Sequence, residues 1–235
     1  MTNTMILDVL LVSFVGGMLC LDRVVLQAMF SRPIVAAPAI GLLLGDGYTG
    51  LIAGAFVELF WIDRLSLGGY IPPNETVVAV LITAASVLAG QILGQLPQGL
   101  IVLAVLLFLP LGVAVQKLEF SLCRKNEIVF KEALADAERG DTKAIADKHL
   151  RSVLRYYLLS AAFILIALPL GIVLLCAVYP RLAGFAVRGL GLLYGILPLL
   201  GCAVALNTIT IRGAIPVFCA AFLVATFAMN FVRGL

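Results

Sequence analysis

The chain has 235 residues, of which 63% are hydrophobic and only 12% are charged. Soluble domains carry charge on nearer a quarter of their residues, so a water-facing surface and a soluble globular fold are excluded. The net charge of +3 is weak, and no basic patch is interleaved with aromatic residues, so nucleic acid is not expected as a partner. We therefore predict an all-α, polytopic membrane protein, in which each helical span needs about 20 apolar residues.

Apolar stretches follow one another along the chain. The stretch 34–44 is too short to cross a bilayer and ends in a Gly-Asp-Gly sequence, which is typical of a re-entrant or interfacial segment. The stretch 153–178 is long enough to cross with tilt. Short, glycine-broken segments of this kind indicate a transport-type interior. The stretches cover residues 5–21, 34–44, 48–62, 77–93, 100–115, 153–178, 190–206 and 215–232.

The segment 116–155 is charged and contains nine of the 16 Lys and Arg residues. Its apolar residues favour two amphipathic helices that break at Gly140-Asp141, with Asp141 or Thr142 as the N-cap of the second. The positive-inside rule places this loop in the cytoplasm. It is either a solvated connector or a docking surface for a soluble partner, and it separates an N-terminal membrane half, 1–115, from a C-terminal membrane half, 156–235.

Residues 1–8 carry no Lys or Arg, so the stretch 5–21 is expected to stay in the membrane rather than to be cleaved as a signal. Pairs of glycines four residues apart predict close helix contacts. These pairs are Gly41/Gly45, Gly50/Gly54 and Gly191/Gly195.

The five cysteines are scattered without metal-ligand spacing, and no phosphate-binding loop motif is present. No cofactor or metal is expected.

The richest polar segment is 54–76. Glu58 lies inside an apolar run, where a charge at the bilayer centre costs about 2.5–3.5 kcal/mol, so it should face protein or water. It is either a ligand for a substrate or ion, or the structural partner of an arginine such as Arg32 or Arg64. The Asp63-Arg64 pair fits a membrane boundary.

A break in regular structure follows. Gly68 and Gly69 allow close backbone approach, and a Pro-Pro pair then precedes the next apolar helix. Asn74 suits the N-cap of that helix and Glu75 suits its first turn.

Two more polar interruptions, 27–33 and 207–216, hold Gln27, Arg32 and Asn207. The single histidine, His149, lies in the charged segment with no recognisable partner. We expect it to be solvated rather than to carry a phosphoryl group.

Three motifs carry a family resemblance. Residues 30–36 read Phe-Ser-Arg-Pro-Ile-Val-Ala and precede the glycines and the Gly-Asp pair of 41–54. Residues 57–59 read Val-Glu-Leu and lead to the Pro-Pro-Asn of 72–74, and a third set spans 189–218. On these motifs the sequence resembles the IIC subunits of the mannose/fructose/sorbose family of the bacterial phosphotransferase system.

The resemblance implies a multi-pass permease subunit in the bacterial inner (cytoplasmic) membrane that translocates a hexose-type sugar. It implies a IID membrane subunit as partner, soluble IIA and IIB subunits that relay phosphate from phosphoenolpyruvate, and an oligomeric assembly in the lipid bilayer. The chain itself offers no phosphoryl-carrying residue, so whether it counts as an enzyme stays open.

We place the predicted sugar site at the broken segment 68–75, facing Gln27, Arg32 and Glu58. Sugar hydroxyls need hydrogen-bond partners that a regular helix cannot offer, whereas the free amides at a helix start can. The substrate-binding candidates are Gln27, Arg32, Glu58, Asp63, Gly68, Gly69, Asn74, Glu75 and Asn207.

Two other functions are compatible with the sequence. The chain could be a non-transporting scaffold or regulator descended from such a subunit. In that case the site residues that depart from the family no longer serve transport. It could also be an ion-coupled secondary transporter that uses Glu58 and Asp63. Co-purification with a IID-like protein and phosphoenolpyruvate-dependent sugar uptake separate these alternatives.

Overall fold

The computed structural model describes residues 3–64, 68, 70–208 and 213–233, and every regular element within these residues is a helix. The all-α fold predicted from the sequence is confirmed. The elements are α1 (Asn3–Leu21), α2 (Pro33–Leu43), α3 (Gly47–Phe60), α4 (Glu75–Leu93), α5 (Gln98–Phe108), α6 (Leu111–Glu138), α7 (Thr142–Val178), a 3₁₀ turn (Tyr179–Arg181), α8 (Gly184–Thr208) and α9 (Ala214–Arg233).

Helix α4 is the centre of the fold. Every residue from Thr76 to Gly90 is buried, because α1, α2, α3, α5, α6 and α7 all pack against it. The predicted N-cap is confirmed: the Asn74 side-chain oxygen accepts a hydrogen bond from the Val77 amide at 2.9 Å. Gly94 ends the helix in a left-handed conformation, with φ of 69°, which glycine adopts without steric cost.

Helices α2 and α3 form a short hairpin against α4. The 11 residues of α2 span about 16 Å, roughly half the hydrocarbon thickness. The chain then turns at Gly45, with φ of 85°, and Asp46 caps α3 by accepting from the Thr49 amide. The amide of Ile34, at the start of α2, contacts Glu58, near the end of α3. The hairpin therefore returns to the end of the molecule at which it began.

Glycine allows the two arms of this hairpin to touch. A Cβ atom on Gly50 would collide with the backbone of Ala37, and one on Gly54 would collide with the carbonyl oxygen of Pro33. The close approach predicted for these glycines is confirmed. It is wrong for Gly191 and Gly195, because no atom of the described residues lies within 4 Å of the position of their missing Cβ.

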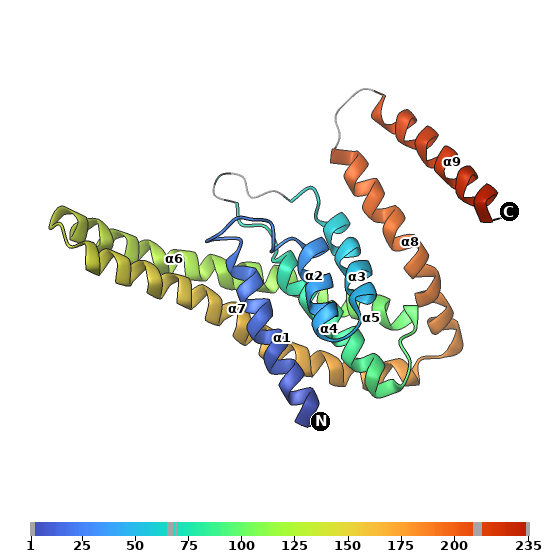
Figure 1. Cartoon of the computed structure of the whole chain (residues 1–235), viewed down its shortest axis with the longest axis horizontal. Coiled ribbons are helices and arrows are strands. Elements are labelled where there is room, and N and C mark those ends of the chain that lie inside the picture. Colours follow the sequence, from blue (N-terminus) through green and yellow to red (C-terminus); the bar gives the residue numbers. More distant parts are fainter. Residues whose placement is uncertain (1–2, 65–67, 69, 209–212, 234–235) are drawn as a thin grey trace.

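Helices α6 and α7 extend as a long two-helix arm, drawn green to gold in Figure 1. The predicted break is present: Gly140 has φ of 71°, and Asp141 caps α7 by accepting from the Ala144 amide at 3.0 Å. Both helices continue without a break into the apolar body. The boundaries predicted at 115/116 and 155/156 thus fall inside continuous helices.

Five helical stretches of the described chain are long and apolar enough to cross a membrane: Thr4–Leu21, Glu75–Leu93, Gln98–Glu138, Thr142–Arg181 and Gly184–Asn207. Their outer faces are apolar as well, as Leu7, Leu10, Phe14 and Met18 show on α1, all of them exposed. An exposed face of this kind suits contact with lipid tails. The protein is a polytopic membrane protein.

We predict that Gly54→Val lowers the thermal unfolding temperature of the purified protein by several degrees. The reason is that the new side chain forces α2 and α3 apart, and overpacking of this kind costs about 1–3 kcal/mol. Gly189→Val on α8 is the matched control, since it makes the same change where nothing lies nearby. Equal unfolding temperatures for the two variants would contradict the packing described here.

Candidate functional site

The loop between α1 and α2 is held by one buried carboxylate. Asp22, 2% exposed, accepts hydrogen bonds from the Ala28 amide at 2.8 Å and from the Ser31 amide and hydroxyl at 3.0 Å each. Burial alone would raise the pKa of Asp22, but the hydrogen bonds from Ser31 and Ala28 lower it below its ordinary value. The ionised carboxylate thereby fixes the loop.

This fixed loop contains an unusual backbone conformation. Gln27 has φ of 53° and Met29 has φ of 66°, and residues other than glycine rarely adopt positive φ. Such conformations persist where the surroundings impose them, often at functional sites. Here the imposing group is Asp22.

Arg32 joins three elements at the same end of the molecule. Its Nε atom lies 3.5 Å from Glu58 Oε1 on α3, and its Nη1 atom lies 3.5 Å from Glu75 Oε1 at the start of α4. The other oxygen of Glu58 accepts from the Ile34 amide on α2 at 3.4 Å. The structural partner expected for Glu58 is therefore Arg32.

A polar pocket of about 260 Å³ opens between the loop and the start of α4. It is smaller than the roughly 300–1,000 Å³ usual for drug-sized ligands, so it suits a small polar molecule. Its walls offer guanidinium, carboxylate, amide and hydroxyl groups. We call it the Arg32 pocket; its lining residues are Asp22, Arg23, Gln27, Met29, Ser31, Arg32, Arg64, Pro72 and Glu75.

Three of the candidates from the sequence line this pocket: Gln27, Arg32 and Glu75. Glu58 is not a lining residue, but it forms an ion pair with Arg32, which is. Asp63 is exposed and pairs with Arg64, a lining residue, at 3.5 Å. Sequence reasoning did not select Asp22, Arg23, Ser31 or Pro72. Of these, Asp22 had a usable signal, namely an acidic residue directly after an apolar span.

The other candidates lie elsewhere. Asn74 is fully buried, and its amide nitrogen donates to Glu119 Oε1 at 2.6 Å. Gly68 is exposed, with φ of 63°. Asn207 is exposed near the end of α8, and Gly69 lies outside the described residues.

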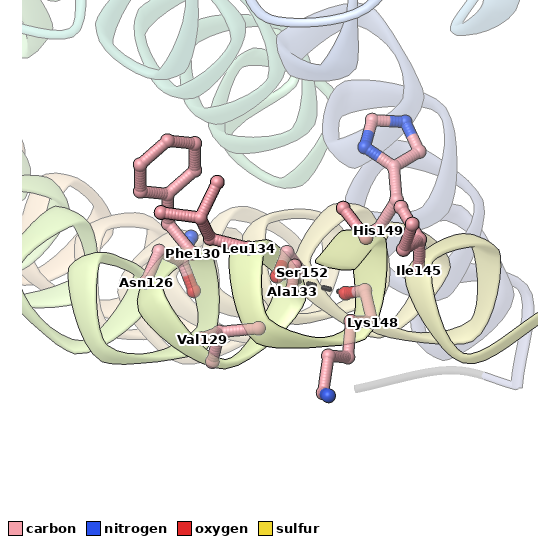
Figure 2. A pocket seen from close by; sticks show the side chains of 10 residues that line it. Asn126, Val129, Phe130, Ala133, Leu134, Ile145, Lys148, His149 and Ser152 are labelled. Carbon is pink, nitrogen blue, oxygen red and sulfur yellow. Dashed lines mark hydrogen bonds between the residues drawn. The ribbon is translucent and has the colours of Figure 1, made fainter. Parts of the chain in front are cut away.

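A second cavity, a groove of about 360 Å³, lies between the two helices of the arm. Figure 2 shows the apolar side chains of α6 and α7 that line it, with Phe130 and His149 pointing out of the arm. The groove offers few groups that could bind hydroxyls. Among the described residues no hydrogen bond or ion pair involves the His149 side chain, so nothing orients it for phosphoryl transfer.

The comparison with known families identifies the family. A family model described as the sorbose-specific IIC component of the phosphotransferase system matches residues 6–233, nearly the whole chain. The chain belongs to the sorbose-type IIC family. The family predicted from the sequence is confirmed, and so is the class of function, a membrane subunit of a sugar phosphotransferase system.

Relatives of this IIC protein carry names for different sugars. It is 24% identical to the mannose-specific EIIC component of Escherichia coli K12, over 96% of this chain and 81% of that one. It is 24% identical to the fructose permease IIC component of Bacillus subtilis 168, over 94% and 79%. It is 26% identical to the sorbose-specific EIIC component of Klebsiella pneumoniae, over 93% and 78%.

Two solved structures share the fold of this IIC protein. One, described only as a membrane protein, has a TM-score of 0.72 and 22% identity, covering 99% of this chain and 93% of that chain. The other is a cryo-EM structure of the mannose transporter ManYZ in complex with microcin E492. It has a TM-score of 0.61 and 22% identity, covering 97% and 88%.

The IIC chain shows binding groups rather than reactive ones in the Arg32 pocket. In the part of the chain that the structure describes, no group of three His, Cys, Asp or Glu residues could hold a metal ion. The lining includes hydrogen-bond donors and acceptors, of which Asp22 and Ser31 hold each other, as do Arg32 and Glu75. Such an arrangement can bind a polar solute.

We predict that Asp22→Ala lowers the thermal unfolding temperature by about 2–10 °C, because buried amides lose their acceptor at a cost of about 1–3 kcal/mol. Asp63→Ala, which removes an exposed carboxylate, is the control and should shift the temperature much less. The measurement is a thermal melt of each purified variant. If both variants melt with the parent, the loop does not depend on Asp22.

Proposed function

We propose that this IIC chain binds a hexose-type sugar in the Arg32 pocket and translocates it, and that partner subunits phosphorylate the sugar. The observation that carries the proposal is Arg32, held between Glu58 and Glu75 beside Gln27. A carboxylate accepts hydrogen bonds from hydroxyl groups, whereas a guanidinium donates to them and an amide does both. A neutral sugar needs both kinds of partner when it leaves water.

The end of the molecule that holds the pocket also holds most of the positive charge. Arg23, Arg32 and Arg64 line the pocket, and nine more Lys and Arg residues lie in the segment 116–155. The two regions adjoin, because Asn74 contacts Glu119 at the base of the arm.

The opposite end is marked by the turn between α7 and α8, where Tyr179 lies against Gly99 at the start of α5. Among the described residues, Arg181 and Arg188 are the only basic residues near that turn in the sequence. The positive-inside rule therefore supports a bacterial inner-membrane orientation in which the arm and the pocket face the cytoplasm.

A pocket that opens to the cytoplasm supports the proposed division of labour. The sugar would be released where soluble phosphoryl carriers can reach it, and the one histidine of this chain lies away from the pocket, on the arm. We therefore assign phosphorylation to soluble IIA and IIB subunits and propose a IID subunit as the membrane partner in an oligomeric complex. The arm, which extends beyond the apolar body, is the candidate surface for the soluble subunits (Figure 1).

The ion-coupled alternative finds less support. Glu58 and Asp63 are each paired with an arginine, Arg32 and Arg64. A cation would have to displace these arginines before it could bind. The sugar-binding measurement below distinguishes a non-transporting scaffold from a sugar-translocating subunit.

We predict that Glu75→Gln and Gln27→Ala each weaken sugar binding by about tenfold or more, or about 1.4 kcal/mol. Glu75→Gln removes the charge that holds Arg32 in place, and Gln27→Ala leaves sugar hydroxyls without a partner. The measurement is equilibrium binding of radiolabelled mannose, fructose and sorbose to the purified complex of this chain with its IID partner. Glu127→Gln, which removes an exposed carboxylate paired with Lys131 on α6, is the control and should bind like the parent. A parent complex that binds none of the three sugars, or pocket variants that bind like the parent, would refute the proposal.

We predict the orientation as well. In a cysteine-free background, cysteine at position 139, at the tip of the arm, should react with a membrane-impermeant maleimide only after the cells are opened. Cysteine at position 181, in the turn between α7 and α8, should react in intact cells. The reverse pattern would place the pocket on the outer face.

A further inference from the structure

A buried polar cluster lies behind the Arg32 pocket. Glu119 on α6 is 3% exposed, and its Oε1 atom accepts from Asn74 Nδ2 at 2.6 Å and from the Tyr156 hydroxyl on α7 at 2.8 Å. Buried carboxylates are expensive, and an apolar side chain of similar size could fill the same space. Packing alone therefore does not explain a carboxylate at this position.

The cluster fixes the first residue before α4 at three points. The Asn74 side-chain oxygen caps α4 through the Val77 amide, and its backbone amide donates to the Gly112 carbonyl at 3.1 Å. Its side-chain nitrogen donates to Glu119. The backbone and the side chain of Asn74 thus each donate a hydrogen bond to α6.

The next residue in the chain is Glu75, which lines the pocket and pairs with Arg32. Successive Cα atoms lie about 3.8 Å apart, so a shift of Asn74 reaches Glu75 almost undiminished. Arg32 in turn holds Glu58. The position of α4 relative to α6 therefore controls the geometry of the pocket.

Arg23 adds a second link between cluster and pocket. It lines the pocket, yet its Nη1 atom is buried without a hydrogen-bond partner. It also acts electrostatically on Cys20 and Tyr156, the same groups that Glu119 acts on.

We propose that Glu119 is a positioning residue for sugar binding: it acts through Asn74 to hold Glu75 and Arg32 in their binding geometry. This inference rests on the proposed function of the Arg32 pocket. It gives Asn74 a positioning role in place of the direct contact with sugar expected from the sequence. It also connects the arm, to which Glu119 and Tyr156 belong, with the pocket.

An exchange of donor and acceptor tests the proposal. Asn74→Asp keeps the cap on α4, since aspartate is as good an N-cap as asparagine. It replaces the amide that donates to Glu119 with a carboxylate, so that two acceptors face each other. It should weaken binding of the best-bound sugar among mannose, fructose and sorbose by about tenfold or more. Glu119→Gln alone should bind within about threefold of the parent, because its amide oxygen can still accept from Asn74 and Tyr156.

The double variant Asn74→Asp/Glu119→Gln decides the matter, because glutamine can donate to the new aspartate and restore the bond in reverse. It should recover binding to within about threefold of Glu119→Gln. Recovery supports the proposal even if Asn74→Asp alone does not fold. The proposal is overturned if the double variant binds as weakly as Asn74→Asp, or if Asn74→Asp binds like the parent.

A double-mutant cycle shows whether Asn74 acts through Glu75. In a Glu75→Gln background, Asn74→Asp should add little further loss of binding, since the group that it positions is already changed. Full additivity would overturn the inference. If Glu75→Gln itself binds like the parent, the proposed function fails; if only the Asn74→Asp effect is missing, the positioning role fails and the pocket assignment stands.

Discussion

The ion pairs of Arg32 are the interaction on which the functional end of this molecule depends. Arg32 directly precedes α2, Glu58 lies near the end of α3, and Glu75 opens α4. In an apolar chain, charges can be kept at this depth only where each finds a partner. Two carboxylates around one guanidinium therefore fix where the α2–α3 hairpin meets α4, and the contacts of Gly50 and Gly54 allow the hairpin to fold tightly enough for this meeting. The pocket beside Arg32 follows from that arrangement.

The helices and their caps could be predicted from the sequence because their signals are local. Asn74 and Asp141 each precede a helical stretch, and Gly140 marks the turn between α6 and α7. The contact between Asn74 and Glu119 joins residues 45 positions apart, and no local pattern indicates it. The same limit explains why Asn74, a polar residue beside a break, was read as a ligand, although in the fold its side chain is completely buried. Glycine spacing was informative only where a partner helix exists: Gly50 and Gly54 meet α2, whereas Gly191 and Gly195 meet no other helix among the described residues.

The candidate site shows a similar division. Gln27, Arg32, Glu58 and Glu75 were predicted together because charged and amide side chains stand out in apolar sequence, and the fold brings them to one end. Asp22 was not selected, since its role depends on amides six and nine residues later that return to it only when the loop closes. Asp63 and Asn207 stood out for the same reason as Arg32, but both lie on exposed surface. Polarity in a membrane sequence thus identifies candidates, and burial with partners separates them.

The Arg32 pocket and the groove of the arm suit different tasks. The groove of the arm is lined largely by apolar side chains and suits the hydroxyls of a sugar less well, since each costs about 1–3 kcal/mol when buried unpaired. The Arg32 pocket offers such partners, and Arg32 and Glu75 already hold each other there, so these two side chains lose little further freedom on binding. Because α6 and α7 run unbroken from the arm to the wall behind the pocket, a protein bound to the arm would act on the same helices that carry Glu119 and Tyr156. Rigid helices transmit such a displacement only where they are bonded to the next element, and in this fold Asn74 bonds the start of α4 to α6 through Glu119 and through the Gly112 carbonyl.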